Sequence, residues 1–174
     1  MRQNSIVILV LSIIMLASSG CVSEPGIDKS KLSELNRTVK ELKTFIASGK
    51  PCDAPDTLLQ QLASGTAALQ DKKASQEKRD LIGGYSRLLT TYKDGLLLCR
   101  RQIQSAQLPI VPKGSIYVFQ DVDPLVEKYG FSTESHLYRP TGVYWKSISG
   151  DSINVIWKNA EFQIKYIENI VNYY

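Results

Sequence analysis

Residues 81–103 have the sequence LIGGYSRLLTTYKDGLLLCRRQI, and this segment decides the expected fold. Its large apolar side chains recur at intervals of three or four residues, the spacing of a helix that packs along one side. Two adjacent glycines, at 83 and 84, cost roughly 2 kcal/mol of helix propensity. They either mark a turn or let another backbone approach closely. The apolar positions are Leu81, Tyr85, Leu88, Tyr92, Leu96, Cys99 and Ile103.

Two shorter segments upstream repeat this spacing. The first covers residues 32–46, and a Gly-Lys-Pro sequence at 49–51 ends it. The second covers residues 58–69, with Asp56 as its expected N-cap. A polar stretch at 70–80 then precedes the segment quoted above. The sequence therefore predicts three helical segments before the chain changes character.

The cysteines distinguish two arrangements of these helices. The chain has three cysteines, and Cys21 belongs to an N-terminal export signal that is described below. The other two, Cys52 and Cys99, are then an even pair, and exported proteins generally join such cysteines in a disulfide. One uninterrupted helix over 56–107 would place Cys99 roughly 65 Å from Cys52, whereas a disulfide needs Cα atoms within about 7 Å. A turn in the polar stretch brings the two cysteines level. We therefore expect an antiparallel three-helix part over residues 28–108, with a Cys52–Cys99 disulfide that stabilises it by about 4 kcal/mol.

Two alternatives stay open for this helical part. In the single long helix, Cys52 and Cys99 could not form a disulfide with each other. The leucine-rich stripe could also be a coiled-coil surface for a partner, although such stripes are usually internal core.

Residues 109–174 differ in character, because they hold 12 of the 15 aromatic residues of the chain. The expected elements are, in order, a strand over 115–120, a short helix over 125–129 capped by Asp123, a loop over 132–141, a hairpin of 143–149 with 152–157 around Gly150-Asp151, and a last helix capped by Asn159. The expected fold class is therefore α+β: an antiparallel three-helix N-terminal part, then a small aromatic-rich part with a mostly antiparallel sheet that a C-terminal helix covers.

The N-terminal segment has the layout of a secretory signal peptide. Arg2 precedes an apolar run at 6–17, and small residues follow it. The ending Ser18-Ser19-Gly20-Cys21 resembles the lipobox of prokaryotic membrane lipoproteins, although Ser18 stands where leucine is typical. The resemblance implies a signal peptide over 1–20, a diacylglyceryl group on Cys21 and a lipid-anchored linker over 21–27.

Two other interpretations of this segment compete with the lipobox. It could be an ordinary signal peptide with Cys21 as a thiol, or an uncleaved anchor, although a spanning helix needs about 20 apolar residues. The resemblance implies a protein anchored in the cell envelope and facing out of the cytoplasm. Val22 replaces the aspartate that commonly retains such proteins at the inner membrane, which favours the outer membrane if the organism has one.

Few residues suggest chemistry. The chain has one histidine, His136, and no cofactor or metal motif, so we expect no cofactor and no metal site. Glu134 and His136 could form a carboxylate–imidazole pair, but no nucleophile is evident beside them. Residues 27–108 hold 14 Lys/Arg against nine Asp/Glu, yet export argues against a nucleic-acid partner and favours a solvated face or anionic lipid headgroups.

Four aromatic residues are the candidates for binding a partner, which would be an envelope protein or a glycan. Tyrosine and tryptophan combine a large rigid surface with a polar tip, although they could equally form the core of a small sheet. Tyr144 should face away from its neighbours, and we expect it to be the most exposed. The candidates are Tyr138, Tyr144, Trp145 and Trp157.

Two classes of function remain open. The first is a lipid-anchored envelope protein with a structural or partner-binding role and no evident catalysis. The second is a small envelope hydrolase, or an inhibitor of an envelope enzyme. The absence of a recognisable nucleophile and acid–base set in the sequence favours the first class.

The lipobox resemblance generates a testable prediction. Cys21→Ala should release the protein from the membrane fraction or leave an unprocessed precursor, because the lipid is attached to the cysteine sulfur. Intact-mass measurement of the mature chain checks this directly. A mature N-terminus at another residue, with no lipid adduct, contradicts the prediction.

Overall fold

The computed structural model describes residues 29–70 and 74–172, which fold into five α-helices, one short 3₁₀ helix and three strands. Cys21, the signal peptide and the linker lie outside the described residues. The elements are α1 (Lys29–Ala47), η2 (Pro51–Asp53), α2 (Asp56–Ala68), α3 (Gln76–Ser105), β1 (Ser115–Tyr117), α4 (Asp123–Tyr129), β2 (Thr133–Tyr138), β3 (Val143–Ser149) and α5 (Ser152–Val171). The α+β fold class is confirmed.

The three-helix arrangement is confirmed, and the single long helix is wrong. α2 ends at Ala68, and α3 begins at Gln76 behind Ser75, whose hydroxyl accepts a hydrogen bond from the Lys78 amide. The turn therefore lies in the polar stretch, and Gly83-Gly84 lie inside α3. α2 begins one residue earlier than expected, because Pro55 occupies the N-cap position and Asp56 the first turn.

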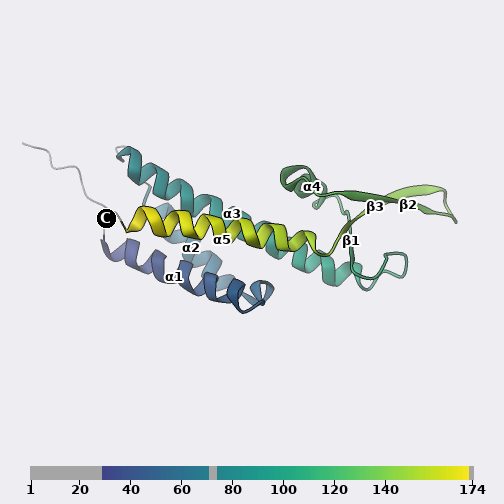
Figure 1. Cartoon of the computed structure of the whole chain (residues 1–174), viewed down its shortest axis with the longest axis horizontal. Coiled ribbons are helices and arrows are strands. Elements are labelled where there is room, and N and C mark those ends of the chain that lie inside the picture. The colour runs from purple at the N-terminus through teal and green to yellow at the C-terminus, as the bar shows by residue number, and fades with distance from the viewer. Residues whose placement is uncertain (1–28, 71–73, 173–174) are drawn as a thin grey trace, which may run out of the picture.

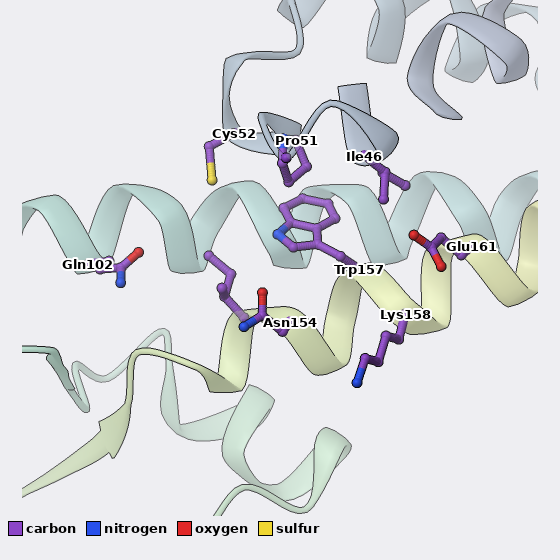
Figure 2. A pocket seen from close by; sticks show the side chains of 10 residues that line it. Ile46, Pro51, Cys52, Gln102, Asn154, Trp157, Lys158 and Glu161 are labelled. Carbon is purple, nitrogen blue, oxygen red and sulfur yellow. The ribbon is translucent and has the colours of Figure 1, made fainter. Parts of the chain in front are cut away.

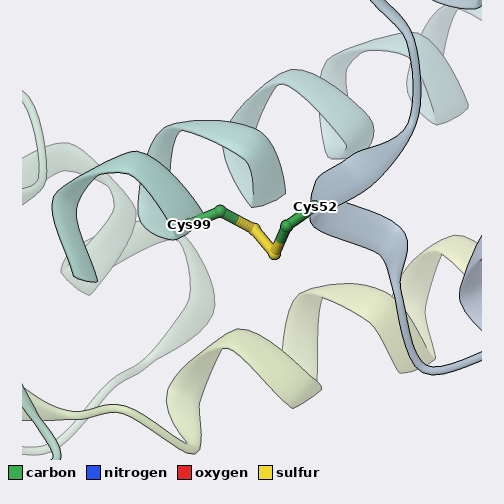
Figure 3. Close-up of a disulfide and its surroundings, with 2 residues drawn as sticks. All are labelled: Cys52 and Cys99. Atoms are coloured by element: carbon green, nitrogen blue, oxygen red, sulfur yellow. A yellow bond between two sulfur atoms is a disulfide. The ribbon is translucent and has the colours of Figure 1, made fainter. Parts of the chain in front are cut away.

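The Cys52–Cys99 disulfide is also confirmed. It joins η2 to the second half of α3, with the two Cα atoms 5.9 Å apart (Figure 3). The bridge thus fixes the connection between α1 and α2 against the middle of the bundle.

The C-terminal part departs from the expected element order in two places, and neither expected cap is a cap: Asp123 is the first residue of α4, and Asn159 lies inside α5. Residues 133–138, expected as a loop, form β2, and residues 152–157, expected as a strand, form the first turns of α5. The three strands are antiparallel in the order β1-β3-β2, so the hairpin consists of β2 and β3. The segment 152–157 becomes helical because its apolar residues continue a helical spacing that buries Ile153, Ile156 and Trp157 together.

α5 packs along α3 and completes a four-helix bundle, while the sheet projects from one end (Figure 1). The expectation that this helix covers a face of the sheet is therefore wrong, because α5 packs on α3. The close packing uses two glycines of α3. A Cβ at Gly95 would lie 2.2 Å from the Trp157 ring, and a Cβ at Gly84 would lie 3.1 Å from Ile167. Of the two roles expected for Gly84, a turn or a close approach of another backbone, the structure shows the second, because α5 packs closely against α3 there.

Two buried tyrosines tie α3 to α1. The Tyr85 hydroxyl donates a hydrogen bond to Asn36 Oδ1 at 2.7 Å, and the Tyr92 hydroxyl donates to the Leu42 carbonyl at 2.6 Å. Burial raises the pKa of both phenols well above the ordinary value, because the interior disfavours the charged phenolate. Both tyrosines therefore hold their protons to a higher pH in the folded chain than in the unfolded chain.

The glycine contact predicts opposite effects for two glycine-to-alanine substitutions. Gly95→Ala should lower the free energy of unfolding by about 2 kcal/mol or more, because the methyl group overlaps the buried Trp157 ring. Gly83→Ala is the matched control in the same helix. Its Cβ meets only the end of the Arg87 side chain, at 3.4 Å, so it should raise stability by up to about 1 kcal/mol. Urea denaturation measures both, and equal effects would contradict the packing argument.

The buried phenols predict a loss of stability in alkali. The unfolded chain loses these protons near pH 10, the ordinary tyrosine value, whereas the folded chain holds them to higher pH. The free energy of unfolding should therefore fall above about pH 10, by up to about 1.4 kcal/mol per pH unit for each tyrosine. Tyr92→Phe should reduce that slope and cost about 1 kcal/mol near neutral pH through its lost hydrogen bond. Denaturant titrations across pH test this, and an unchanged slope would contradict it.

Candidate partner-binding site on the hairpin

The β2–β3 hairpin is the part of the molecule that extends furthest from the bundle (Figure 1). Its connection ends at Gly142, whose φ of 71° lies in the left-handed region that glycine adopts without a steric penalty. The Gly142 amide donates a hydrogen bond to the Tyr138 carbonyl at 2.9 Å and closes the turn. The register places Leu137 opposite Tyr144.

Apolar side chains are exposed on both faces of the hairpin near its tip. Leu137 and Tyr144 form a cross-strand pair on one face, and Tyr144 is 71% exposed. Tyr138 and Val143 form the adjacent pair on the other face and are also exposed. Tyr144 is therefore the most exposed of the four aromatic candidates, as the alternation of side chains predicted.

β2 also presents an edge of the sheet. The strand order leaves one side of β2 without a neighbouring strand in the described residues, and five of its six residues are exposed. Such an edge carries backbone donors and acceptors that can pair with an added strand. The hairpin thus combines exposed apolar side chains with an accessible backbone edge.

Trp145 occupies a different position from Tyr144, although the two are adjacent in sequence. It is only 9% exposed and lies between the Tyr117 ring, at 5.3 Å, and the His136 ring, at 4.2 Å. Tyr117 in turn contacts Phe119 at 4.7 Å, and the Arg101 guanidinium lies 4.5 Å from the Phe119 ring. We call these five residues the aromatic ladder. It connects all three strands to α3, so Trp145 serves the root of the sheet.

The Glu134–His136 pair acquires a third member in the structure, but not in a catalytic geometry. Ser147 Oγ lies 2.8 Å from His136 Nε2, and Glu134 Oε2 lies 4.0 Å from the same nitrogen. A serine–histidine–carboxylate relay needs the carboxylate on the other ring nitrogen. Ser147 is moreover buried, so a substrate cannot reach its hydroxyl as the chain is folded.

Asp94 holds α4 against α3 through two side chains. Lys128 Nζ lies 2.5 Å from its carboxylate, and the Tyr129 hydroxyl donates to it at 2.8 Å. Burial and the hydrogen bond to Asp94 raise the pKa of Tyr129. Desolvation lowers the pKa of Lys128, but the hydrogen bond and charge of Asp94 outweigh it and raise the pKa overall. Every member of this cluster has a partner, so it stabilises the fold and offers no free catalytic group.

Trp157 lies in the helical bundle and not on the hairpin. It is 6% exposed, with its ring 5.3 Å from that of Tyr92. One side of it lines a cleft of about 400 Å³ beside the disulfide, where the indole lies between α5 and Pro51 (Figure 2). The sequence did not indicate this cleft, because α1, η2, α3 and α5 all contribute to it. Its polar lining residues are Gln102, Asn154, Lys158 and Glu161.

The structure therefore brings together only part of the expected site. Tyr138 and Tyr144 lie near the hairpin tip on opposite faces, Trp145 lies in the aromatic ladder, and Trp157 lies in the helical bundle. Leu137 and Val143 were missed as surface residues, because Leu137 lay in an expected loop and an aliphatic residue in a strand, such as Val143, usually indicates core. Their exposure depends on how far the hairpin extends beyond the bundle.

Over residues 29–70 and 74–172, no group of three or more His, Cys, Asp or Glu side chains could hold a metal ion. No helix in that part of the chain is both long enough and apolar enough to cross a bilayer. No protein-family model, curated protein or solved structure matches the chain. The disulfide itself indicates an oxidising location outside the cytoplasm.

Proposed function

We propose that this chain is a non-catalytic envelope protein, anchored by lipid on Cys21, that binds another envelope protein through the β2–β3 hairpin. The observation that carries the proposal is the pair Leu137–Tyr144. Two directly opposed apolar side chains, both largely exposed, lie beside an accessible strand edge. A partner strand added to β2 would gain backbone hydrogen bonds from the edge and side-chain contacts from this pair.

The position of the hairpin supports the same proposal. α1 begins at the opposite end of the bundle from the hairpin (Figure 1). α3, with 30 residues, spans about 45 Å between the two ends. A lipid on Cys21 would hold the protein by its α1 end and leave the hairpin free to meet a partner. The helical bundle then acts as a spacer of fixed length.

The hydrolase alternative has less support. Its best candidates are Glu134 and His136, but Glu134 and the buried Ser147 both lie against the same His136 ring nitrogen, Nε2. The cleft beside the disulfide has a lysine and a glutamate, but no histidine, serine or free cysteine lines it. The partner-binding role is therefore the function that we propose.

Replacing Tyr144 tests the proposal. Tyr144→Ala should change the free energy of unfolding by no more than about 0.5 kcal/mol, because the side chain is exposed. It should lower recovery of the partner in a crosslinked pull-down from intact envelopes by roughly ten-fold, the loss expected for an aromatic residue at the centre of an interface. Crosslinked peptides identify the partner by mass spectrometry, and a glycan adduct would contradict a protein partner.

Ile103→Ala is the matched control, because Ile103 is 64% exposed on α3 and lines a recess with Cys52, Asp56 and Cys99 beside the disulfide. It should leave recovery unchanged. Equal recovery with Tyr144→Ala and Ile103→Ala would remove the hairpin from the interface. A loss of several kcal/mol of stability with unchanged recovery would instead identify Tyr144 as a structural residue.

A further inference from the structure

α5 has a second exposed apolar face, which borders α3 at one end: a Cβ at Gly84 would lie 3.6 Å from the Tyr166 ring. Val155, Phe162 and Tyr166 are spaced by seven and four residues, so they fall within about 40° of one another around the helix. All three are exposed, and Phe162 is 71% exposed. The buried residues of α5, among them Ile156, Ala160 and Ile164, lie on roughly the opposite side of the helix. We call these three residues the outer stripe of α5.

The outer stripe is bordered by basic side chains. Lys158 and Lys165 are exposed and lie along one side of it, four residues before and three residues after Phe162. On the other side, the Arg87 guanidinium of α3 lies 5.6 Å from the Tyr166 ring. Glu168 at the far end of α5 is paired with Lys43 at 2.7 Å, which offsets its charge. Glu161 lies farther round the helix than Lys158 and Lys165, and both Glu161 and Lys158 line the cleft.

An exposed aromatic stripe between basic side chains matches an anionic lipid surface. Helices that lie in a membrane interface place aromatic and aliphatic residues at the boundary of the acyl chains, with Lys and Arg directed to the headgroups. The attraction of lysine and arginine to anionic lipids adds to the apolar contact. A second copy of this chain fits less well, because self-association through this face would place Lys158 and Lys165 of both copies in one interface, where like charges repel.

We propose that the outer stripe of α5 rests on the surface of an anionic bilayer, so that the bundle lies along the membrane. The proposal goes beyond the partner-binding role and needs neither the hairpin nor its partner.

The lipid anchor of the proposed function would strengthen this contact. α5 finishes at the end of the bundle where α1 begins (Figure 1). The eight residue steps from Cys21 to Lys29 span at most about 28 Å. An anchor there would keep Tyr166 within reach of the bilayer and raise the effective concentration of the face at the lipid surface.

Fluorescence quenching by brominated lipids tests the orientation. The full chain is reconstituted into vesicles of equal parts phosphatidylglycerol and phosphatidylcholine, brominated on the acyl chains. Phe162→Trp should show strong quenching of the introduced indole, measured against the unsubstituted chain with its buried Trp145 and Trp157. Tyr144→Trp places a probe of equal exposure on the hairpin and should show little added quenching.

The charge contribution is tested in the Phe162→Trp background. Lys158→Gln with Lys165→Gln should lower the ratio of docked to undocked protein by roughly five-fold for each lysine removed, because each contributes to the attraction for anionic lipid. Lys31→Gln with Lys113→Gln removes two exposed lysines from other elements and should leave the quenching unchanged. Vesicles of phosphatidylcholine alone should give little quenching.

Each remaining outcome overturns the proposal. Quenching at the hairpin probe in place of Phe162→Trp would reverse the orientation. Equal quenching with both lipid compositions would exclude an anionic surface as the ligand. Crosslinks between α5 helices of two chains, without quenching, would make the outer stripe a contact between copies. None of these results depends on partner recovery or on the mass of the mature N-terminus, so they are separable from the proposed function.

Discussion

The contact between Gly95 of α3 and Trp157 of α5 is the constraint on which the rest of the molecule depends. The glycine leaves a space that the indole fills, with no room for a Cβ between them. Because the indole is seated there, α5 must follow α3 with one side buried, and the rotation of α5 about its axis is fixed. That rotation turns Val155, Phe162 and Tyr166 outward. It also sets where the chain leaves β3 to enter α5, and therefore where the sheet is attached.

The aromatic ladder fixes the position of the sheet relative to α3. Arg101 lies near the end of α3, and its guanidinium contacts the Phe119 ring and forms an ion pair with Asp121. The Ser105 hydroxyl accepts a hydrogen bond from the Tyr117 amide at 2.9 Å, which fixes β1 against the same helix. β3 pairs with β1, and β2 pairs with β3. The rings contact one another in series and bury Trp145, whereas Tyr144 at the tip of the hairpin is exposed.

The sequence predicted the features that local rules determine. Helical spacing located α1, α2 and α3, and the cysteine pair excluded the long helix through a simple distance limit. The pleat of a strand placed Tyr144 outward. The sequence did not predict β2, because Thr-Glu-Ser-His-Leu-Tyr is mostly polar and becomes a strand only through pairing with β3. It also mistook the start of α5 for a strand, since Ile153, Val155 and Trp157 fit a two-residue alternation as well as a helical turn. The helix forms because the Trp157 ring fits into the space at Gly95 of α3, a residue far away in the sequence.

The connectivity of the sheet has a consequence for how this molecule can change. α3 ends at Ser105 and α5 begins at Ser152, so α4 and the whole sheet form an excursion between two packed helices. The excursion leaves and returns at nearly the same point: the Gly150 amide donates to the Gly114 carbonyl at 2.7 Å, and a Cβ at Gly150 would lie 2.9 Å from Gln102 of α3. The segment is nevertheless held to the bundle along its length, because Ile116, Leu125 and Ile148 belong to the same hydrophobic core as the helices. Only the exposed connection between β2 and β3, at 139–142, can therefore be lengthened, shortened or exchanged with little effect on the helices.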